Sequence, residues 1–189
     1  MGAKSTRQRW TYAEFARLPS EGSTRYEVID GEVCVTPSPT GRHQEIVTRL
    51  VARLFVFADS RGLGGVFAGP LDVLFAEGDY LEPDILFIRS SRSHLVTDRS
   101  VEGPPDLVVE VLSPPTAARD RGVKLDRYRL YGVQEYWLVD PDARTVEVWG
   151  FAEGGREAVV LGAGDTLRWT PIEDADTLEI RLSELFVME

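Results

Sequence analysis

The chain has 189 residues, of which 43% are hydrophobic, which is enough for one domain with a buried core. Its formal net charge of −10 excludes the broad basic surface on which the electrostatic part of nucleic-acid or anionic-membrane binding depends. The single cysteine, Cys34, excludes an internal disulfide, and no apolar run reaches the roughly 20 residues of a membrane helix. Residues 1–9 are polar and basic rather than a signal peptide, so we expect a cytoplasmic protein without a membrane partner.

The first part of the chain predicts a short helix and then a β-hairpin. Thr11–Glu14 has the form of a capping box, and Pro19 follows where such a helix would end. The strand-like segments 26–29 and 32–35 flank Asp30-Gly31. An Asp-Gly pair supplies the positive φ angles that a two-residue turn demands, so this region is expected to form a hairpin.

The middle of the chain changes to a helical period and then to strands. From Arg42 to Asp59, apolar residues recur on one helical face. We expect a strand over 66–75, a turn at 77–79 and a second strand over 83–88. The polar stretch from Ser90 to Pro104 is interpreted as a loop.

The second half of the chain contains a βαβ unit. It consists of a buried strand over 107–112, a helix over 116–131 that Gly132 ends, and a buried strand over 135–139. Such a unit normally joins two parallel strands by a right-handed crossover. Further strands are expected over 145–151, 158–161 and 178–182, with a final helical turn over 183–187.

This order of elements predicts an α/β or α+β domain with a mixed sheet flanked by helices. No linker or repeat interrupts the sequence, so residues 1–189 are expected to form one domain. Its core would span about 26–149 and include the N-terminal hairpin, and 150–189 would be a β-rich C-terminal extension. The apolar edges of the hairpin would suit a homodimer.

Glu110 interrupts the otherwise apolar strand 107–112. An ionised carboxylate in a strand covered on both faces would cost about several kcal/mol without a compensating partner. The chain must therefore supply a metal ion, a Lys or Arg, or a water-filled cleft for this side chain.

Asp84 is the candidate neighbour of Glu110. A Pro-Asp pair opens each of two apolar strands, at 83–84 and at 105–106. If these strands are adjacent, Asp84 and Glu110 can point to the same side of the sheet, because side chains alternate along a strand. Two carboxylates brought close together favour a divalent cation, and oxygen ligands of this kind suit Mg²⁺ or Mn²⁺.

Lys124 lies on the helix that follows the Glu110 strand, on a stripe with Tyr128 and Tyr131. A lysine beside a metal-bound carboxylate can orient a water molecule or stabilise charge developing on a phosphate. Asp120 stands four residues earlier, so an ordinary helical salt bridge is the alternative. The two tyrosines are most simply core residues with solvated hydroxyls.

The other candidates also have structural interpretations. Asp84 could begin a strand and cap a turn, and Glu110 could be a buried acid paired with a basic residue. His43, on the apolar face of its helix, is more often a core or capping residue than a catalytic one. Asp72 interrupts another apolar strand, where a solvated edge position is favoured over a third metal carboxylate.

In order, Pro83-Asp84, Glu110 and Lys124 resemble the motif of the PD-(D/E)XK nuclease superfamily, which has the restriction-endonuclease-like fold. More closely, the chain from about Tyr26 to Trp149 resembles the Uma-type family, bacterial proteins described as restriction endonucleases. The segments that carry this resemblance are Ile29–Glu32, Ser38-Pro39 followed by His43, Pro83-Asp84, Pro105–Ser113, Asp120–Lys124 and Gly132–Trp137.

The resemblance implies that Asp84 and Glu110 bind Mg²⁺, with the backbone carbonyl of Val111 as an extra ligand. It also implies that Lys124 helps to position the water that attacks a DNA phosphodiester. The superfamily pattern places its lysine two residues after the strand acid, where this chain has Leu112. The resemblance suggests that the lysine has moved to the following helix.

Three functions are open on the sequence, and a Mg²⁺-dependent endonuclease acting on DNA is favoured. The second is a catalytically inactive nuclease-fold module that binds a protein or nucleic acid, and the third is a phosphohydrolase with a smaller substrate. The acidic charge opposes DNA binding unless basic residues gather locally. The candidates for such a patch are Arg42, Arg49, Arg53, Arg119, Arg121, Arg127 and Arg129.

Overall fold

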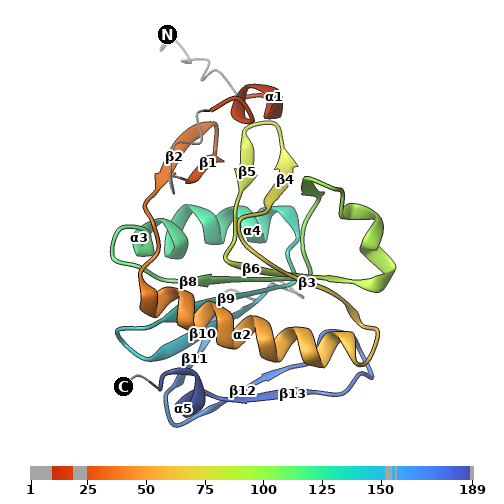
Figure 1. Ribbon diagram of the computed structural model, residues 1–189, viewed down its shortest axis with the longest axis vertical. Helices are drawn as coiled ribbons and strands as arrows, with labels where there is room; N and C mark the ends of the chain where they lie inside the picture. Colours follow the sequence, from red (N-terminus) through yellow and green to blue (C-terminus); the bar gives the residue numbers. More distant parts are fainter. Residues whose placement is uncertain (1–9, 19–24, 152–154, 156, 188–189) are drawn as a thin grey trace.

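The computed structural model describes residues 10–18, 25–151, 155 and 157–187. A six-stranded sheet lies at its centre (Figure 1). Its strands are β3 (Gly64–Ala68), β6 (Ile85–Arg89), β8 (Leu107–Val111), β9 (Glu135–Asp140), β10 (Thr145–Gly150) and β11 (Ala158–Gly162). They are ordered β11-β10-β9-β8-β6-β3, with β8 and β9 parallel and the other neighbours antiparallel. The predicted mixed sheet is confirmed, as is the parallel pairing within the βαβ unit.

A second sheet has five strands and carries the N-terminal hairpin. Its strands are β1 (Arg25–Ile29), β2 (Glu32–Thr36), β4 (Asp72–Ala76), β5 (Asp79–Leu81) and β7 (Ser100–Glu102), in the order β2-β1-β5-β4-β7. Asp30 and Gly31 have φ angles of 54° and 79°, so the hairpin turn is the one that the Asp-Gly pair predicts. A separate pair consists of β12 (Thr166–Trp169) and β13 (Leu178–Arg181).

Most helices lie where the sequence predicts them, but the helix expected over 116–131 divides into three parts. They are α1 (Tyr12–Phe15), α2 (Gly41–Asp59), the 3₁₀ turn η1 (Ser90–Leu95), α3 (Ala117–Arg119), the π-helical turn η2 (Asp120–Lys124), α4 (Leu125–Tyr131) and α5 (Leu182–Leu185). Thr11 forms the predicted capping box with Glu14, and Gly132 ends α4 with a φ of 84°. Pro19 and residues 1–9 lie outside the described residues. No helix in the described part of the chain is both long enough and apolar enough to cross a membrane.

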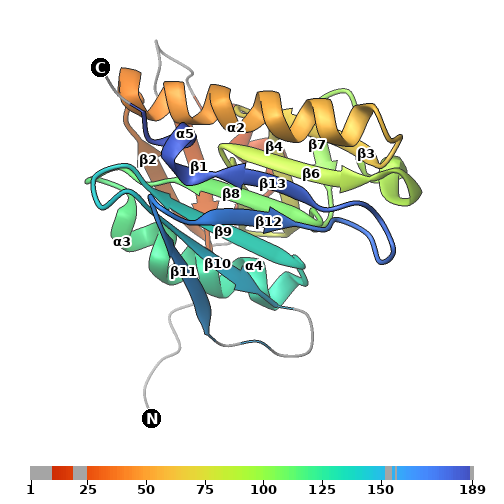
Figure 2. The same ribbon diagram turned by 90° about the horizontal axis from the view of Figure 1, so that it is seen from below.

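Helices cover both faces of the six-stranded sheet. The buried stripe of α2, which includes Leu50 and Leu54, packs on one face together with β12, β13 and α5. On the other face, Tyr128 of α4 packs against Val108 and Leu138. Figure 2 shows α2 along one side of the molecule and α3 and α4 on the other. Glu110 of β8 and Asp84, which immediately precedes β6, therefore lie in the middle layer.

The prediction of one strand over 66–75 is wrong. The segment divides into β3 and β4, which belong to different sheets, and Gly69-Pro70 lies between them. The Gly69 amide donates to the carbonyl of Asp84 at 2.9 Å, and Pro70 has no amide hydrogen with which to continue a ladder. The expected loop over 90–104 also contains η1 and β7, and β5 and β12 were not predicted.

Candidate active site

Glu110 lies on β8, and Asp84 immediately precedes the neighbouring strand β6. Ile85 pairs with Val109 in the antiparallel ladder, and the same register continued by one residue places Asp84 opposite Glu110. The two carboxylates have partners from different helices: that of Asp84 contacts His43 of α2, and that of Glu110 contacts Lys124 of η2 and Tyr128 of α4. Both acids line a cavity of about 180 Å³. The expectation that their strands are adjacent is confirmed.

The carboxylate of Asp84 is held by partners on three sides. Its Oδ2 lies 2.9 Å from His43 Nε2 and accepts the Val111 amide hydrogen, also at 2.9 Å. The guanidinium of Arg25 lies 3.7 Å from Oδ1. Burial alone would raise the pKa of Asp84, but the His43 hydrogen bond and charge, followed by the Val111 amide, outweigh it, so its pKa is lowered. Asp84 is therefore ionised over a wide pH range.

Glu110 receives two hydrogen bonds from the helical segment above it. Lys124 Nζ lies 2.7 Å from Glu110 Oε1, and the Tyr128 hydroxyl donates to the same oxygen at 2.8 Å. The expectation of a solvated Tyr128 hydroxyl is therefore wrong. Burial raises the pKa of Glu110 well above its ordinary value. The positive charge of Lys124 lowers this pKa, but the negative charges of Asp120 and Asp84 offset that effect. The site thus contains more negative charge than the lysine balances.

Lys124 points toward the acids from the π-helical turn η2. That turn buries both Asp120 and Lys124, and π-helical turns occur frequently at functional sites. The alternative salt bridge within the helix is also present, since Asp120 Oδ1 lies 3.6 Å from Nζ, but the contact with Glu110 is much shorter. Burial alone would lower the pKa of Lys124, yet the surrounding carboxylates, Glu110 first, raise it. Lys124 is therefore a cation held between acids.

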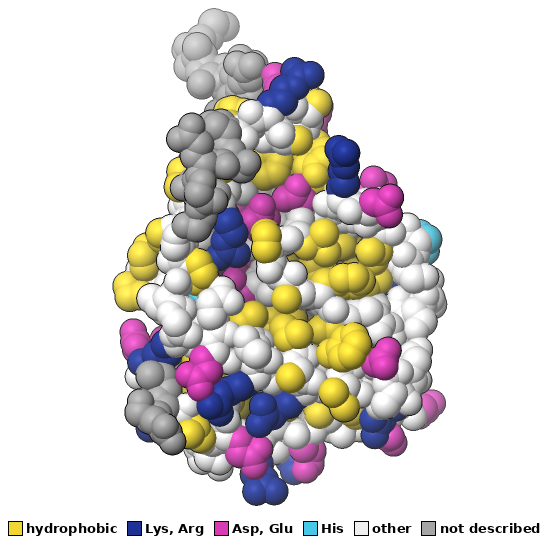
Figure 3. Space-filling view, in the orientation of Figure 1, with side chains coloured by type: hydrophobic (Ala, Val, Ile, Leu, Met, Phe, Trp, Pro, Cys, Tyr) yellow, Lys and Arg dark blue, Asp and Glu magenta, His cyan; other side chains and the backbone are white. Residues whose placement is uncertain are grey.

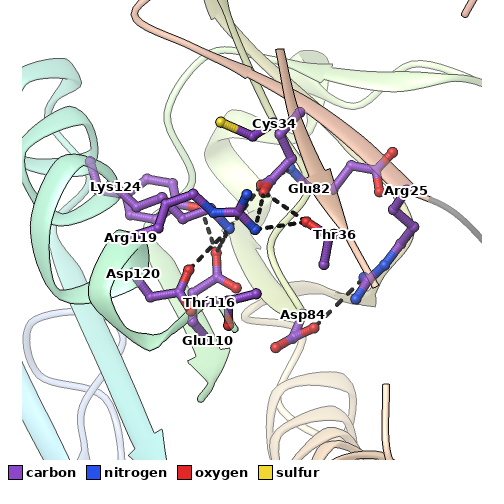
Figure 4. A network of polar contacts seen from close by, with 12 residues as sticks. Arg25, Cys34, Thr36, Glu82, Asp84, Glu110, Thr116, Arg119, Asp120 and Lys124 are labelled. Atoms are coloured by element: carbon purple, nitrogen blue, oxygen red, sulfur yellow. Dashed lines mark hydrogen bonds and ion pairs between the residues drawn. The ribbon is translucent and has the colours of Figure 1, made fainter. Parts of the chain in front are cut away.

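Glu27 is a member of this cluster that the sequence analysis missed. It lies on β1, is 2% exposed, and its Oε1 is 2.8 Å from Lys124 Nζ. Its Oε2 lies 3.4 Å from Arg119, and its Oε1 also accepts the Glu82 amide hydrogen at 3.0 Å. Figure 4 shows Arg119 and Lys124 on the helical segment beside Glu110 and Asp120, with Arg25 pointing to Asp84 from the other side. Like Glu110, Glu27 is an acid inside a strand, and this pattern could have identified it from the sequence.

Asp72 has a different environment from the one expected. It lies on β4, which is between β5 and β7, so the favoured solvated edge position is wrong. Its Oδ2 accepts a hydrogen bond from the Tyr12 hydroxyl at 2.7 Å. Asp72 does not line the cavity that contains Asp84 and Glu110. The structure thus leaves these two as the opposed pair.

Comparison with known proteins places the chain in a family. A family model named Uma2, described as "Putative restriction endonuclease", matches residues 12–179. The chain belongs to the Uma2 family. The resemblance identified from its motifs is confirmed.

Two similar proteins extend this comparison. An "Uncharacterized protein" of Synechocystis sp. is 26% identical over 139 residues, which cover 72% of this chain and 78% of that protein. A crystal structure of a "putative nuclease belonging to DUF820" from Anabaena variabilis matches with a TM-score of 0.77 and 24% identity. That match covers 93% of this chain and 97% of the other. The restriction-endonuclease-like fold of this Uma2 protein is therefore confirmed.

The arginines expected to form a basic patch are not free cations in this Uma2 structure. Each lies within salt-bridge distance of at least one carboxylate. The pairs are Arg42–Asp142, Arg49–Glu45, Arg53–Glu184, Arg119–Glu27, Arg121–Asp140, Arg127–Asp30 and Arg129–Asp126. Their charge is compensated locally, so they supply little net attraction for phosphates.

The oxygens around the cavity fit a hard divalent cation. Lys124 and Tyr128 both bind Oε1 of Glu110, so these contacts do not use Oε2. Within the ranges that the structure describes, no three His, Cys, Asp or Glu side chains gather as ligands. A cation would therefore depend on Asp84, Glu110, main-chain oxygen and water. Mg²⁺ usually retains several waters and takes one or two protein carboxylates, so this donor set suits it.

Proposed function

We propose that this Uma2 protein is a metal-dependent endonuclease that hydrolyses phosphodiester bonds in DNA. The observation that carries the proposal is the convergence of Asp84 and Glu110 on one cavity, with the ammonium group of Lys124 at 2.7 Å from Glu110. The description of the family as restriction endonucleases and that of the Anabaena protein as a nuclease support this function. All three side chains border one cavity, which gives a substrate phosphate a place to bind.

In this proposal Asp84 and Glu110 hold a Mg²⁺ or Mn²⁺ ion, and the carbonyl of Val111 is a further ligand. When bound, such an ion lowers the pKa of water and neutralises phosphate oxygens. The amide of Val111 already fixes Asp84, because it donates to Oδ2 at 2.9 Å. His43 holds the same oxygen from α2, so the acid is oriented before any ligand arrives.

Lys124 would act as the fixed positive charge of the site. Its Nζ is bound by Glu110 and Glu27, so it is held in one position rather than moving freely. A preorganised cation stabilises negative charge that develops on a phosphate and orients the attacking water. A lysine directed away from the acids would have favoured the inactive binding module, so its observed direction supports the enzyme.

The test is cleavage of supercoiled plasmid and of single-stranded DNA with Mg²⁺, Mn²⁺ or a chelator. We expect metal-dependent cleavage by the wild type and a loss of at least about 100-fold in D84N and E110Q. E179Q is the matched control, because Glu179 is an exposed acid on β13 and its loss should leave the rate unchanged.

Calorimetry with Mg²⁺ separates binding from turnover. The wild type should bind the ion, and D84N and E110Q should bind it much more weakly. Cleavage that persists in both variants, or in the chelator, would overturn the proposal. Absence of both cleavage and metal binding would favour the inactive module, and cleavage of small phosphodiesters without DNA cleavage would favour the smaller-substrate hydrolase.

A further inference from the structure

A second hollow adjoins the candidate active site along α2. It has a volume of about 340 Å³. Arg25 and Asp84 line both this groove and the cavity that contains Glu110. The two hollows therefore meet at the Arg25–Asp84 pair, and a ligand bound at Asp84 can extend into the groove. We call this second hollow the α2 groove.

The α2 groove has an apolar wall with polar groups along it. Six residues of α2 form that wall, at helical spacings of three and four, and Ala68 and Gly69 lie on the opposite side. The six are Gln44, Val47, Thr48, Val51, Ala52 and Phe55. The ring of Phe55 is presented to solvent, since the residue is 50% exposed. Figure 3 shows hydrophobic side chains gathered across the middle of this face, mostly just above the line that α2 follows in Figure 1.

The charges around the cavity make phosphate attraction a weak source of affinity. Among the described residues that line it, Arg25 contacts Asp84, and Arg119 and Lys124 contact Glu27. The chain as a whole carries a net charge of −10. A nucleic acid bound at Asp84 must therefore gain much of its binding free energy from contacts other than those with phosphates. Stacking of bases on aromatic side chains is such a source and needs no positive charge.

We infer that the α2 groove binds the nucleobase of a nucleotide next to the phosphate at Asp84, so that the preferred substrate is single-stranded or locally unpaired DNA. This inference rests on the proposed nuclease function and specifies its substrate. In a duplex, both faces of a base are covered by its neighbours, so only an unpaired or extruded base can place a face on Phe55. Gln44 and Thr48 place polar groups near the edge of such a base.

The first experiment measures base binding without requiring cleavage. A short single-stranded DNA containing 2-aminopurine is titrated with protein in the presence of Ca²⁺, and quenching of the probe reports stacking. We expect quenching by the wild type, and much weaker quenching when the same probe lies within a duplex. F55A should lose at least about 5-fold in affinity, which corresponds to the lower end of base–aromatic stacking.

The control variant is L130A. Leu130 is also an exposed large apolar residue, 65% accessible, but it lies on α4 and does not border the groove. This variant should bind the probe like the wild type. Because Phe55 and Leu130 are both exposed, neither substitution should prevent folding, and circular dichroism would verify this.

The second experiment compares cleavage rates on single-stranded and duplex DNA of one sequence. The inference predicts a preference for the single strand that F55A reduces and L130A retains. Equal cleavage of both substrates by wild type and F55A would overturn the base site and leave the nuclease standing. Quenching that depends on Phe55, without any cleavage of DNA, would support the base site and overturn the nuclease function. Sedimentation showing a homodimer that F55A dissociates, with no change in quenching, would assign the groove to a second copy and overturn the inference.

Discussion

The ammonium group of Lys124 lies 2.7 Å from the carboxylate of Glu110, although the two residues are 14 positions apart in the sequence. Leu112, which stands where the superfamily motif has its lysine, is instead 5% exposed and packs with Leu125 and Tyr128. The strand thus contributes an apolar residue at this position, and the helix above the sheet supplies the cation. That Lys124 takes the place of the motif lysine, as the family resemblance suggested, stays a prediction.

Removal of the Lys124 charge should strongly destabilise the fold. In K124M, the buried carboxyl groups of Glu27, Glu110 and Asp120 would lose the cation that they share. Loss of one partner of a buried ion pair typically costs about 3–5 kcal/mol, and we expect the free energy of unfolding to fall by that amount. Urea denaturation measures it. R168M is the control, since Arg168 forms an exposed pair with Glu179 that should contribute less than about 1 kcal/mol.

Replacement of Gly69 by alanine should displace the backbone at Pro83 and Asp84. A Cβ on Gly69 would lie 2.8 Å from the carbonyl oxygen of Pro83, which is too close for a normal contact. We expect G69A to lose about 1–3 kcal/mol of stability through overpacking and to bind Mg²⁺ more weakly. In G150A the added Cβ has no atom within 4 Å, so this variant should retain both properties. A G69A protein with wild-type stability and metal affinity would contradict the argument.

The elements that the sequence predicts well are those with local causes. The Asp-Gly turn, the capping box at Thr11 and the helix end at Gly132 depend on backbone conformations that neighbouring residues impose. Glu110 was recognisable because a charge inside an apolar strand requires a partner, wherever that partner lies. These signals were sufficient to place the central strands and the opposed acids.

The contacts that the sequence did not predict join distant parts of the chain. Glu27 contacts Lys124 only because the hairpin sheet packs beside the helical segment. The segment 66–75 divides at Gly69-Pro70 because β3 and β4 join different sheets, and no periodicity within 66–75 indicates which sheet each half joins. Tyr128 has the apolar spacing of a core residue, and only the position of Glu110 beneath it gives its hydroxyl an acceptor. Such features follow from tertiary packing rather than from a local pattern.

Loss of the His43 ring should weaken metal binding without removing a ligand. His43 Nε2 lies 2.9 Å from Asp84 Oδ2 and fixes the orientation of that carboxylate. Loss of a residue that orients a ligand typically costs about 10–100-fold in metal affinity or activity, and we expect this range for H43A in calorimetry with Mg²⁺. H94A is the control, because His94 is exposed and lies on η1. Equal affinity in H43A and H94A would show that His43 only fills the core.

The pH dependence of stability should change when Glu135 is replaced by Gln. Burial raises the pKa of Glu135 despite a hydrogen bond that Trp137 Nε1 donates to it at 2.6 Å. A carboxyl group with a raised pKa contributes stability below its unfolded pKa of about 4.3 and loses that contribution as the pH rises through the folded value. The glutamine of E135Q stays neutral and keeps an oxygen for Trp137, so its unfolding free energy relative to wild type should increase from pH 4 to pH 8. Urea denaturation across this range measures the difference. A difference that stays constant with pH, or that falls toward pH 8, would mean that the Glu135 carboxylate is well solvated in the folded protein.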